Sequence, residues 1–203
     1  MKQEIEATTE QQILDAAKTV FQAKGMDGAR MQEIANQAGI NKAMLHYYYR
    51  SKQLLFEAVF KQAFSLLAPQ LNNILNDDSS IEEKIRNFTA NYTSFMMKHP
   101  YLPNFIIQEL NRNEDFILKL KENTGFPNLQ KFKTQVDTEI KNGTIKAIGA
   151  DQLFVNIIAL NIFPFLGKPL IKALANKDEK TYNDFVESRK SEVANFIINA
   201  IKC

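Results

Sequence analysis

The chain has 203 residues, of which 45% are hydrophobic and 24% charged, and its formal net charge is +2. This length can bury a core as one domain or two small ones, and the composition is that of an ordinary soluble protein. The single cysteine, Cys203, excludes an intramolecular disulfide and fits a reducing compartment. The N-terminus lacks the apolar segment of a signal peptide, and no apolar run approaches the roughly 20 residues of a membrane span. These features predict a cytoplasmic protein that does not associate with membranes.

The first predicted helix begins near Thr9, whose spacing from Gln12 suits a capping box, and ends at Gly25. Its apolar side chains recur with helical period at Ile13, Leu14, Ala17, Val20 and Phe21. A short link containing Gly28 follows, and a second helix is expected from about Arg30.

Residues 31–52 predict two short helices around a tight corner. The first helix carries Ile34, Ala35 and Ala38 on one face, which can pack inward. Gly39 follows at once, where a chain leaving a helix favours the left-handed conformation that glycine tolerates best.

Asn41 is placed to cap the second helix of this pair, with Leu45 and either Tyr48 or Tyr49 expected on its inward face. A helix, a glycine corner and a capped helix form the helix-turn-helix unit, whose second helix can enter a DNA major groove.

Charge supports this interpretation, because no acidic residue lies between Glu33 and Glu57. The same window contains the cations Lys42, Arg50 and Lys52, together with His46 and three successive tyrosines. Cations interleaved with phenols suit a phosphate backbone, which accepts ion contacts and hydroxyl hydrogen bonds. The alternative is a small packed helix pair with a solvated face. The coincidence of corner, cap and acid-free window favours DNA binding.

The rest of the chain has helical patterning without useful strand alternation, so the sequence predicts an all-α protein of nine or ten helices. The first expected features are a long helix capped by Ser51 that Pro69 bends or ends, and a helix capped by Ser79 or Ser80 that ends at His99-Pro100. A short helix follows Pro103, another covers 114–123, and breaks at Gly125 and Pro127 precede a helix from Leu129 that is closed by Asn142-Gly143. The last two are an apolar helix that is capped by Asp151 and contains Pro164, after which the apolar pattern resumes, and a final helix from about Tyr182 to Ala200.

The aromatic side chains of the C-terminal two-thirds allow two interpretations. They can form a plain helical core, or they can line a ligand cavity between helices, with methionine as an adaptable wall. The candidate ligand-binding residues are Phe60, Phe64, Phe88, Tyr92, Phe95, Met96, Phe105 and Phe126.

The segment from Leu153 to Leu166 is apolar on too many sides for a merely amphipathic helix. Such a helix is buried all round in its own chain or is covered by a partner chain. With the final helix it could form half of a two-fold four-helix interface, and a monomeric core is the alternative.

Catalytic and metal chemistry find little support. There is no glycine-rich phosphate loop, and His46 and His99 have no cysteine or carboxylate set at metal-ligand spacing. We therefore expect no catalytic residue, no metal site and no cofactor. A helical small-molecule carrier or interaction protein without specific DNA binding is the alternative function, but it does not explain the N-terminal third.

From about Thr9 to Phe60, the sequence resembles the DNA-binding domain of the tetracycline-repressor (TetR) family of bacterial transcriptional regulators. The matching blocks are I-L-D-A-A-K-T-V-F-Q-A-K-G, E-I-A-N-Q-A-G-I-N-K and L-H-Y-Y-Y-R-S-K-Q-L-L-F, in that order. The resemblance implies a three-helix helix-turn-helix domain over residues 1–52 and a helical effector-binding and dimerisation domain over residues 53–203.

The resemblance also implies DNA-contacting positions: Arg30, Asn41, Lys42, Ala43, Met44, His46, Tyr47, Tyr48 and Lys52. Lys42 could donate to guanine, Ala43 or Met44 could touch a thymine methyl group, and Lys52 is expected near a phosphate. Arg30 stands where the family commonly has a capping Ser or Thr and cannot cap in that way, and His46 replaces a frequent tyrosine. The resemblance also implies that Leu45 and Tyr49 lie in the core.

The function implied by the resemblance is that of a repressor which binds a palindromic operator in double-stranded DNA as a homodimer through its two C-terminal helices. A small-molecule effector in the larger domain would release it by shifting the population of conformations. The aromatic and methionine candidates favour an apolar or amphipathic effector.

Overall fold

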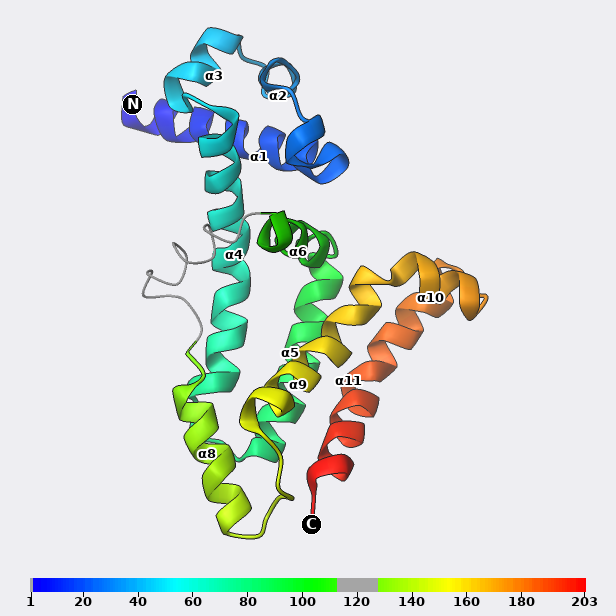
Figure 1. Ribbon diagram of the computed structural model, residues 1–203. Helices are drawn as coiled ribbons and strands as arrows, with labels where there is room; N and C mark the ends of the chain where they lie inside the picture. Colours follow the sequence, from blue (N-terminus) through cyan, green and yellow to red (C-terminus); the bar gives the residue numbers. More distant parts are fainter. Residues whose placement is uncertain (1, 113–127) are drawn as a thin grey trace. The chain divides into compact units, whose positions relative to one another are not determined.

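The computed structural model describes residues 2–112 and 128–203 (Figure 1), and within them the chain forms ten α-helices and no named strand. The all-α class is confirmed. The helices are α1 (Lys2–Gly28), α2 (Met31–Gln37), α3 (Lys42–Tyr48), α4 (Lys52–Asn76), α5 (Ile81–Lys98), α6 (Leu102–Arg112), α8 (Gln130–Lys141), α9 (Ala150–Leu166), α10 (Lys168–Leu174) and α11 (Glu179–Ile201).

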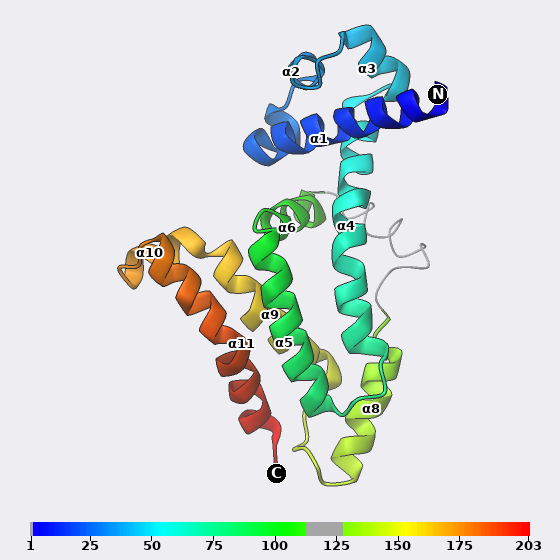
Figure 2. The same ribbon diagram turned by 180° about the vertical axis from the view of Figure 1, so that it is seen from behind.

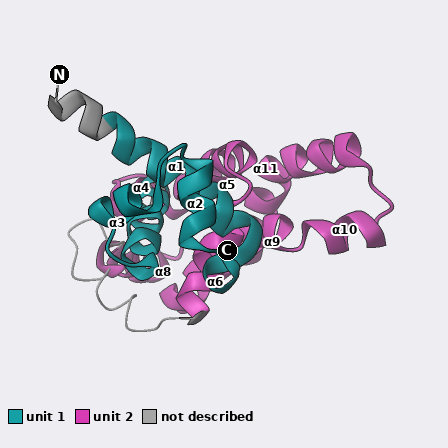
Figure 3. Cartoon of the chain, turned by 90° about the horizontal axis from the view of Figure 1, so that it is seen from above, with its two compact units in different colours: residues 1–66 teal, residues 67–203 magenta. Residues whose placement is uncertain are grey.

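The helices form two compact units, residues 1–66 and residues 67–203 (Figure 3). The division falls inside α4, so this one helix contributes to both units. The predicted boundary after Lys52 concerns the roles of the two parts rather than their packing, and it stays a prediction.

In the first unit, α1 already begins at Lys2, so the predicted capping box at Thr9 is wrong. No glycine or proline precedes Thr9, and nothing in the local sequence therefore stops the helix from starting earlier. The helix was predicted to end at Gly25, but α1 continues to Gly28 with a kink at Gly25, whose φ of 67° is not helical. Phe21 is buried and meets Phe56 of α4 edge to face, with ring centroids 4.9 Å apart.

In the second unit, α5 packs against α8, α9 and α11. Figures 1 and 2 both show α11 running alongside α5. The core face of α5 is apolar and buried at Ile81, Ile85, Phe88, Tyr92 and Met96. Aromatic and aliphatic groups at this helical spacing account for the pairing of α5 with its neighbours.

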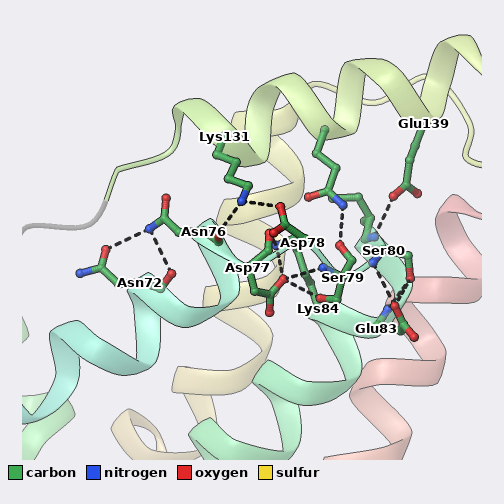
Figure 4. Close-up of polar contacts among 12 residues, drawn as sticks. Asn72, Asn76, Asp77, Asp78, Ser79, Ser80, Glu83, Lys84, Lys131 and Glu139 are labelled. Atoms are coloured by element: carbon green, nitrogen blue, oxygen red, sulfur yellow. Dashed lines mark hydrogen bonds and ion pairs between the residues drawn. The ribbon is translucent and has the colours of Figure 1, made fainter.

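The predicted cap before α5 is confirmed at Ser80. Its side chain accepts from the Glu83 amide, while the Glu83 carboxylate accepts from the Ser80 amide, which completes a capping box. Behind this cap, the fully buried Lys84 donates to the Asp77 carbonyl at 2.8 Å and to the Asp77 carboxylate (Figure 4).

Three side chains one helical turn apart on α8 also bind the turn between α4 and α5 (Figure 4). Lys131 donates to the Asn76 carbonyl and to Asp78, both at 2.7 Å, Gln135 donates to the Ser79 carbonyl, and Glu139 accepts from the Ile81 amide at 2.9 Å. These bonds and the Lys84 contacts satisfy much of the polar backbone of the turn.

One other local prediction is wrong. Asp151 does not cap α9, because Gly149 occupies the cap position and Asp151 lies in the first turn, where its carboxylate pairs with Lys133 at 2.8 Å. Of the two outcomes predicted for Pro69, an end of the helix is excluded, because α4 continues to Asn76, and a bend stays a prediction. The predictions for 114–123, Gly125 and Pro127 fall outside the described residues.

The chain turns by 74° between α9 and α10, at Gly167 and shortly after Pro164. No single described helix has the length and hydropathy to cross a membrane, although α9 and α10 reach both when taken together across this bend.

Candidate nucleic-acid interface

The corner between α2 and α3 is built on Gly39, whose φ is +69°. The Gly39 amide donates to the Asn36 carbonyl at 3.1 Å, and the Ile40 amide donates to the Ala35 carbonyl at 3.0 Å. This pair of bonds is the Schellman motif, which closes a helix and requires a left-handed residue where Gly39 stands. The predicted glycine corner is therefore confirmed.

Asn41 caps α3 as predicted, because its side-chain oxygen accepts from the Met44 amide at 2.8 Å. Leu45 is the one fully buried residue of this seven-residue helix. On α2, Ile34 and Ala35 are fully buried, as expected from their spacing. The local sequence thus places α3 on α2 and leaves most of the α3 surface exposed.

The exposed side chains of α3 include most of the predicted DNA-contacting residues of this helix: Lys42, Ala43, Met44, His46 and Tyr47. Tyr47 is 78% exposed, and its ring meets the half-buried ring of Tyr48 edge to face at 5.5 Å. A helix that presents a cation, a small apolar group and hydroxyl or imidazole donors has the chemistry needed to contact base edges and phosphates.

Two cations flank the helix pair. Arg30 is exposed at the N-cap position of α2 and makes no side-chain capping bond there, as predicted. Lys52, in the first turn of α4, donates to the Asp27 carbonyl at 3.3 Å and the Ala29 carbonyl at 3.1 Å. An ammonium group has three donors, so one N–H of Lys52 remains for a phosphate oxygen. The sequence did not predict the two carbonyl contacts.

Tyr49 differs from its predicted place in the core. Its side chain is half-buried, and its hydroxyl donates to the Glu10 carboxylate at 2.9 Å across 39 residues of sequence. Burial, the hydrogen bond and the charge of Glu10 together raise the pKa of the Tyr49 hydroxyl well above its ordinary value. The hydroxyl therefore stays a donor over the whole physiological range.

The predicted ligand-binding residues fall in different parts of the chain. Phe60 and Phe64 belong to the first unit, where their rings stack at 6.1 Å. The second unit holds Phe88, Tyr92, Phe95, Met96 and Phe105, and Phe126 lies outside the described residues. Burial fits a core as well as a cavity wall, so the ligand-binding set stays a prediction. In the described parts of the chain, no group of three or more His, Cys, Asp or Glu is placed to hold a metal ion.

Residues 13–59 match the family model described as bacterial regulatory proteins of the tetR family. The probable HTH-type transcriptional regulator YttP of Bacillus subtilis is 20% identical over 80% of the chain and 79% of its own length. The HTH-type transcriptional repressor NicS of Pseudomonas putida is 28% identical over about half of each chain (50% and 48%). The biofilm operon icaADBC negative regulator IcaR of Staphylococcus aureus is 40% identical over 31% of this chain and 32% of its own.

Solved structures share the whole fold. A TetR family transcription regulator from Marinobacter aquaeolei VT8 aligns over 100% of this chain and 99% of its own, with a TM-score of 0.68 and 16% identity. A TetR-family regulator from Haemophilus influenzae aligns over 98% and 99%, with a TM-score of 0.62 and 18% identity. Three observations therefore point to the same kind of protein: the N-terminal family match, the exposed face of α3 and this shared architecture. The chain is a DNA-binding transcriptional regulator, and its residues 13–59 form a DNA-binding domain of the TetR family.

Proposed function

We propose that the protein is a homodimeric repressor that binds a palindromic operator and is released by a small apolar or amphipathic effector. The observation that carries the proposal is the exposed first turn of α3, with Lys42 beside Ala43 and Met44 in a window without acidic residues. The relatives NicS and IcaR are named as a repressor and a negative regulator, which supports repression here.

On the DNA side, α3 enters the major groove and Lys42 donates to guanine, while Ala43 or Met44 contacts a thymine methyl group. Asn41, His46, Tyr47 and Tyr48 complete the contacts of this helix with bases or backbone. Arg30 and Lys52 bind phosphates, which fixes the register of α3 on the duplex without reading sequence.

On the assembly side, α9 exposes Val155, Ala159 and Phe163 at four-residue spacing, so they share one helix face. Val155 is 57% exposed, Phe163 is 53% exposed, and Phe196 of α11 is 67% exposed. Exposed apolar side chains grouped in this way favour a protein partner. A second copy of the same two helices buries them and pairs two α3 helices with two half-sites.

On the effector side, α5 brings aromatic rings together in the second unit, with Phe88 and Tyr92 at 4.9 Å. The buried Asn161 of α9 donates to the Ile157 carbonyl at 2.8 Å and to the Thr89 hydroxyl at 3.4 Å, which adds polar groups to this apolar interior. Apolar walls with a few polar groups are typical of small-molecule sites between helices. Effector binding there favours a conformation that no longer matches the operator.

The DNA contacts are tested with Lys42→Ala and Lys52→Ala on a duplex selected by the wild-type protein and on a scrambled duplex. We expect Lys42→Ala to weaken operator binding by about 1–3 kcal/mol and to leave scrambled-duplex binding nearly unchanged. Lys52→Ala weakens binding to both duplexes and flattens the dependence on salt by about one counterion for each protomer. Equal effects of Lys42→Ala on both duplexes would exclude a base contact.

The dimer is tested with the double variant Phe163→Glu and Phe196→Glu in sedimentation equilibrium. We expect a monomer that no longer binds the operator tightly, because burying two carboxylates against an apolar partner is costly. Leu54→Glu, which alters a 49% exposed leucine of the first unit, is the matched control and should stay dimeric. A double variant that remains dimeric would place the interface elsewhere.

A further inference from the structure

The recognition helix α3 is too short and too little buried to fix its own orientation. It contains seven residues, of which only Leu45 is fully buried. A helix this short is not stable in isolation, and packing against its neighbours must fix it. A single buried side chain near the middle of a helix prevents the helix from sliding but leaves it able to tilt about that side chain.

The two ends of α3 are held by different means. At the N-terminal end, Asn41 caps the helix through the Met44 amide, a bond within the same turn that does not tie α3 to another helix. At the C-terminal end, the Tyr49 hydroxyl donates to Glu10 of α1, which spans the unit from its third helix to its first. Tyr49 directly follows α3, and its amide still bonds the Leu45 carbonyl at 2.8 Å.

We propose that Tyr49 is a positioning residue for DNA recognition, because its hydroxyl bond to Glu10 fixes the tilt of α3 against α1. Leu45 and this bond together give α3 two points of attachment, and two points define the direction of a rod. The three successive tyrosines therefore divide their roles, with the 78% exposed Tyr47 presented to DNA and Tyr49 holding the helix that presents it.

The charge of Glu10 supports a positioning role. A carboxylate close to the DNA-binding helix repels phosphates and by itself lowers affinity for any duplex. Tyr49 directs its hydroxyl to this carboxylate at 2.9 Å, so the hydroxyl already has an ionised acceptor in the free protein. The bond orders the helix before DNA arrives, which reduces the ordering cost of binding.

The proposal is tested with a double-mutant cycle of Tyr49→Phe and Glu10→Gln on operator and scrambled duplexes over a range of salt concentrations. Tyr49→Phe keeps the ring and removes only the hydroxyl. We expect it to lower operator affinity by about threefold to tenfold and to leave scrambled-duplex affinity and the salt dependence unchanged. Glu10→Gln removes one negative charge and raises scrambled-duplex affinity in both backgrounds equally.

The energetic coupling between Tyr49 and Glu10 distinguishes a role in positioning α3 from an effect of the Glu10 charge alone. If the bond positions α3, Tyr49→Phe weakens operator binding more in the wild-type background than in the Glu10→Gln background, because the strong ionised acceptor is already lost there. Equal effects of Tyr49→Phe in both backgrounds would overturn the proposal. A loss of affinity for both duplexes, with a flatter salt dependence, would instead assign the hydroxyl to a phosphate and overturn it as well.

A second readout does not depend on DNA, so failure of the proposal can be told from failure to obtain an operator. Amide hydrogen exchange of the free dimer should speed up about threefold to tenfold in α3 for Tyr49→Phe, while exchange in α5 and α11 stays unchanged. Unchanged exchange in α3 would contradict the proposal even if operator binding were weakened.

Discussion

Each unit contains a polar joint, meaning hydrogen bonds between side chains and neighbouring elements that hold those elements together. The two joints differ in how deeply they are buried. In the first unit, one hydrogen bond at the surface, from Tyr49 to Glu10, links α3 to α1. In the second unit, the turn between α4 and α5 is held by several bonds around Lys84, whose side chain is 0% exposed. The difference indicates that α3, the helix proposed to contact DNA, is held by few bonds, whereas the turn at the end of α4 is fixed by a buried charged group that is costly to expose.

Burial explains why the second joint is the stronger. Partial burial acts to raise the pKa of Asp77, but the hydrogen bonds from Lys84 and Ser79 outweigh it, so the pKa lies below its ordinary value. The Asp77 carboxylate and carbonyl together neutralise and solvate an ammonium group that water does not reach. An ion pair of this kind is costly to break from one side only.

The largest expected effect comes from breaking the Lys84 joint on the acidic side. Asp77→Ala leaves the buried ammonium group without its counter-charge, and because the Asp77 side chain is itself 42% exposed we expect a loss of about 2–3 kcal/mol in the free energy of unfolding. Lys84→Met replaces the charge with an apolar chain of similar length, and its cost should stay within about 1 kcal/mol. Urea denaturation followed by circular dichroism measures both, and a Lys84→Met loss as large as that of Asp77→Ala would contradict the account.

A smaller effect is expected at the two helix ends built on left-handed glycines. Gly39 and Gly143 have φ values of 69° and 71°, and neither would bring a new Cβ within 4 Å of another group. Each change to alanine should therefore cost about 1–2 kcal/mol of stability from backbone strain alone. Gly39→Ala should also weaken operator binding, whereas the matched Gly143→Ala variant should bind as the wild type does.

The comparison of Gly39 and Gly143 becomes informative through DNA titration alongside denaturation. If both variants bound DNA equally well, the corner between α2 and α3 would tolerate strain without moving α3. That result would contradict the conclusion that only a few contacts hold α3 in place.

The smallest effect is a pH dependence of the second joint. The pKa of Asp77 is lower in the folded chain than in the unfolded chain, so the unfolded chain binds more protons and stability rises with pH in that window. The contribution is present above the unfolded value of about 4 and is lost as pH falls below it. Denaturation from pH 5 to pH 2 should show a steeper loss for the wild type than for Lys84→Met, and parallel curves would speak against the pair.

The local sequence was enough to predict those helix ends that are stabilised by residues close to them in the chain. The Gly39 corner, the Asn41 cap and the Ser80 capping box each depend on bonds within a few positions, and all three were predicted. The caps assigned to Thr9 and Asp151 failed, because a residue with capping chemistry is equally acceptable inside a helix when the preceding residues are also helical.

Long-range contacts were beyond the sequence. The bond from Tyr49 to Glu10 spans 39 residues, and the bond from Lys52 to the Ala29 carbonyl spans 23. Neither has a periodic signal, because each depends on where folding places two distant helices. The sequence was enough to propose which side chains of α3 contact DNA, but it did not predict the contacts that hold this helix in place.

The central claim is that α3 recognises DNA sequence and acts in pairs. Selection of the purified protein against a random duplex library at near-physiological salt tests it most directly. The account predicts enrichment of an inverted repeat, whose half-sites lie about one helical turn, or a multiple of it, apart. Weak, salt-sensitive binding without enrichment would contradict sequence recognition by α3, and a small-molecule carrier would then become the better description of the chain.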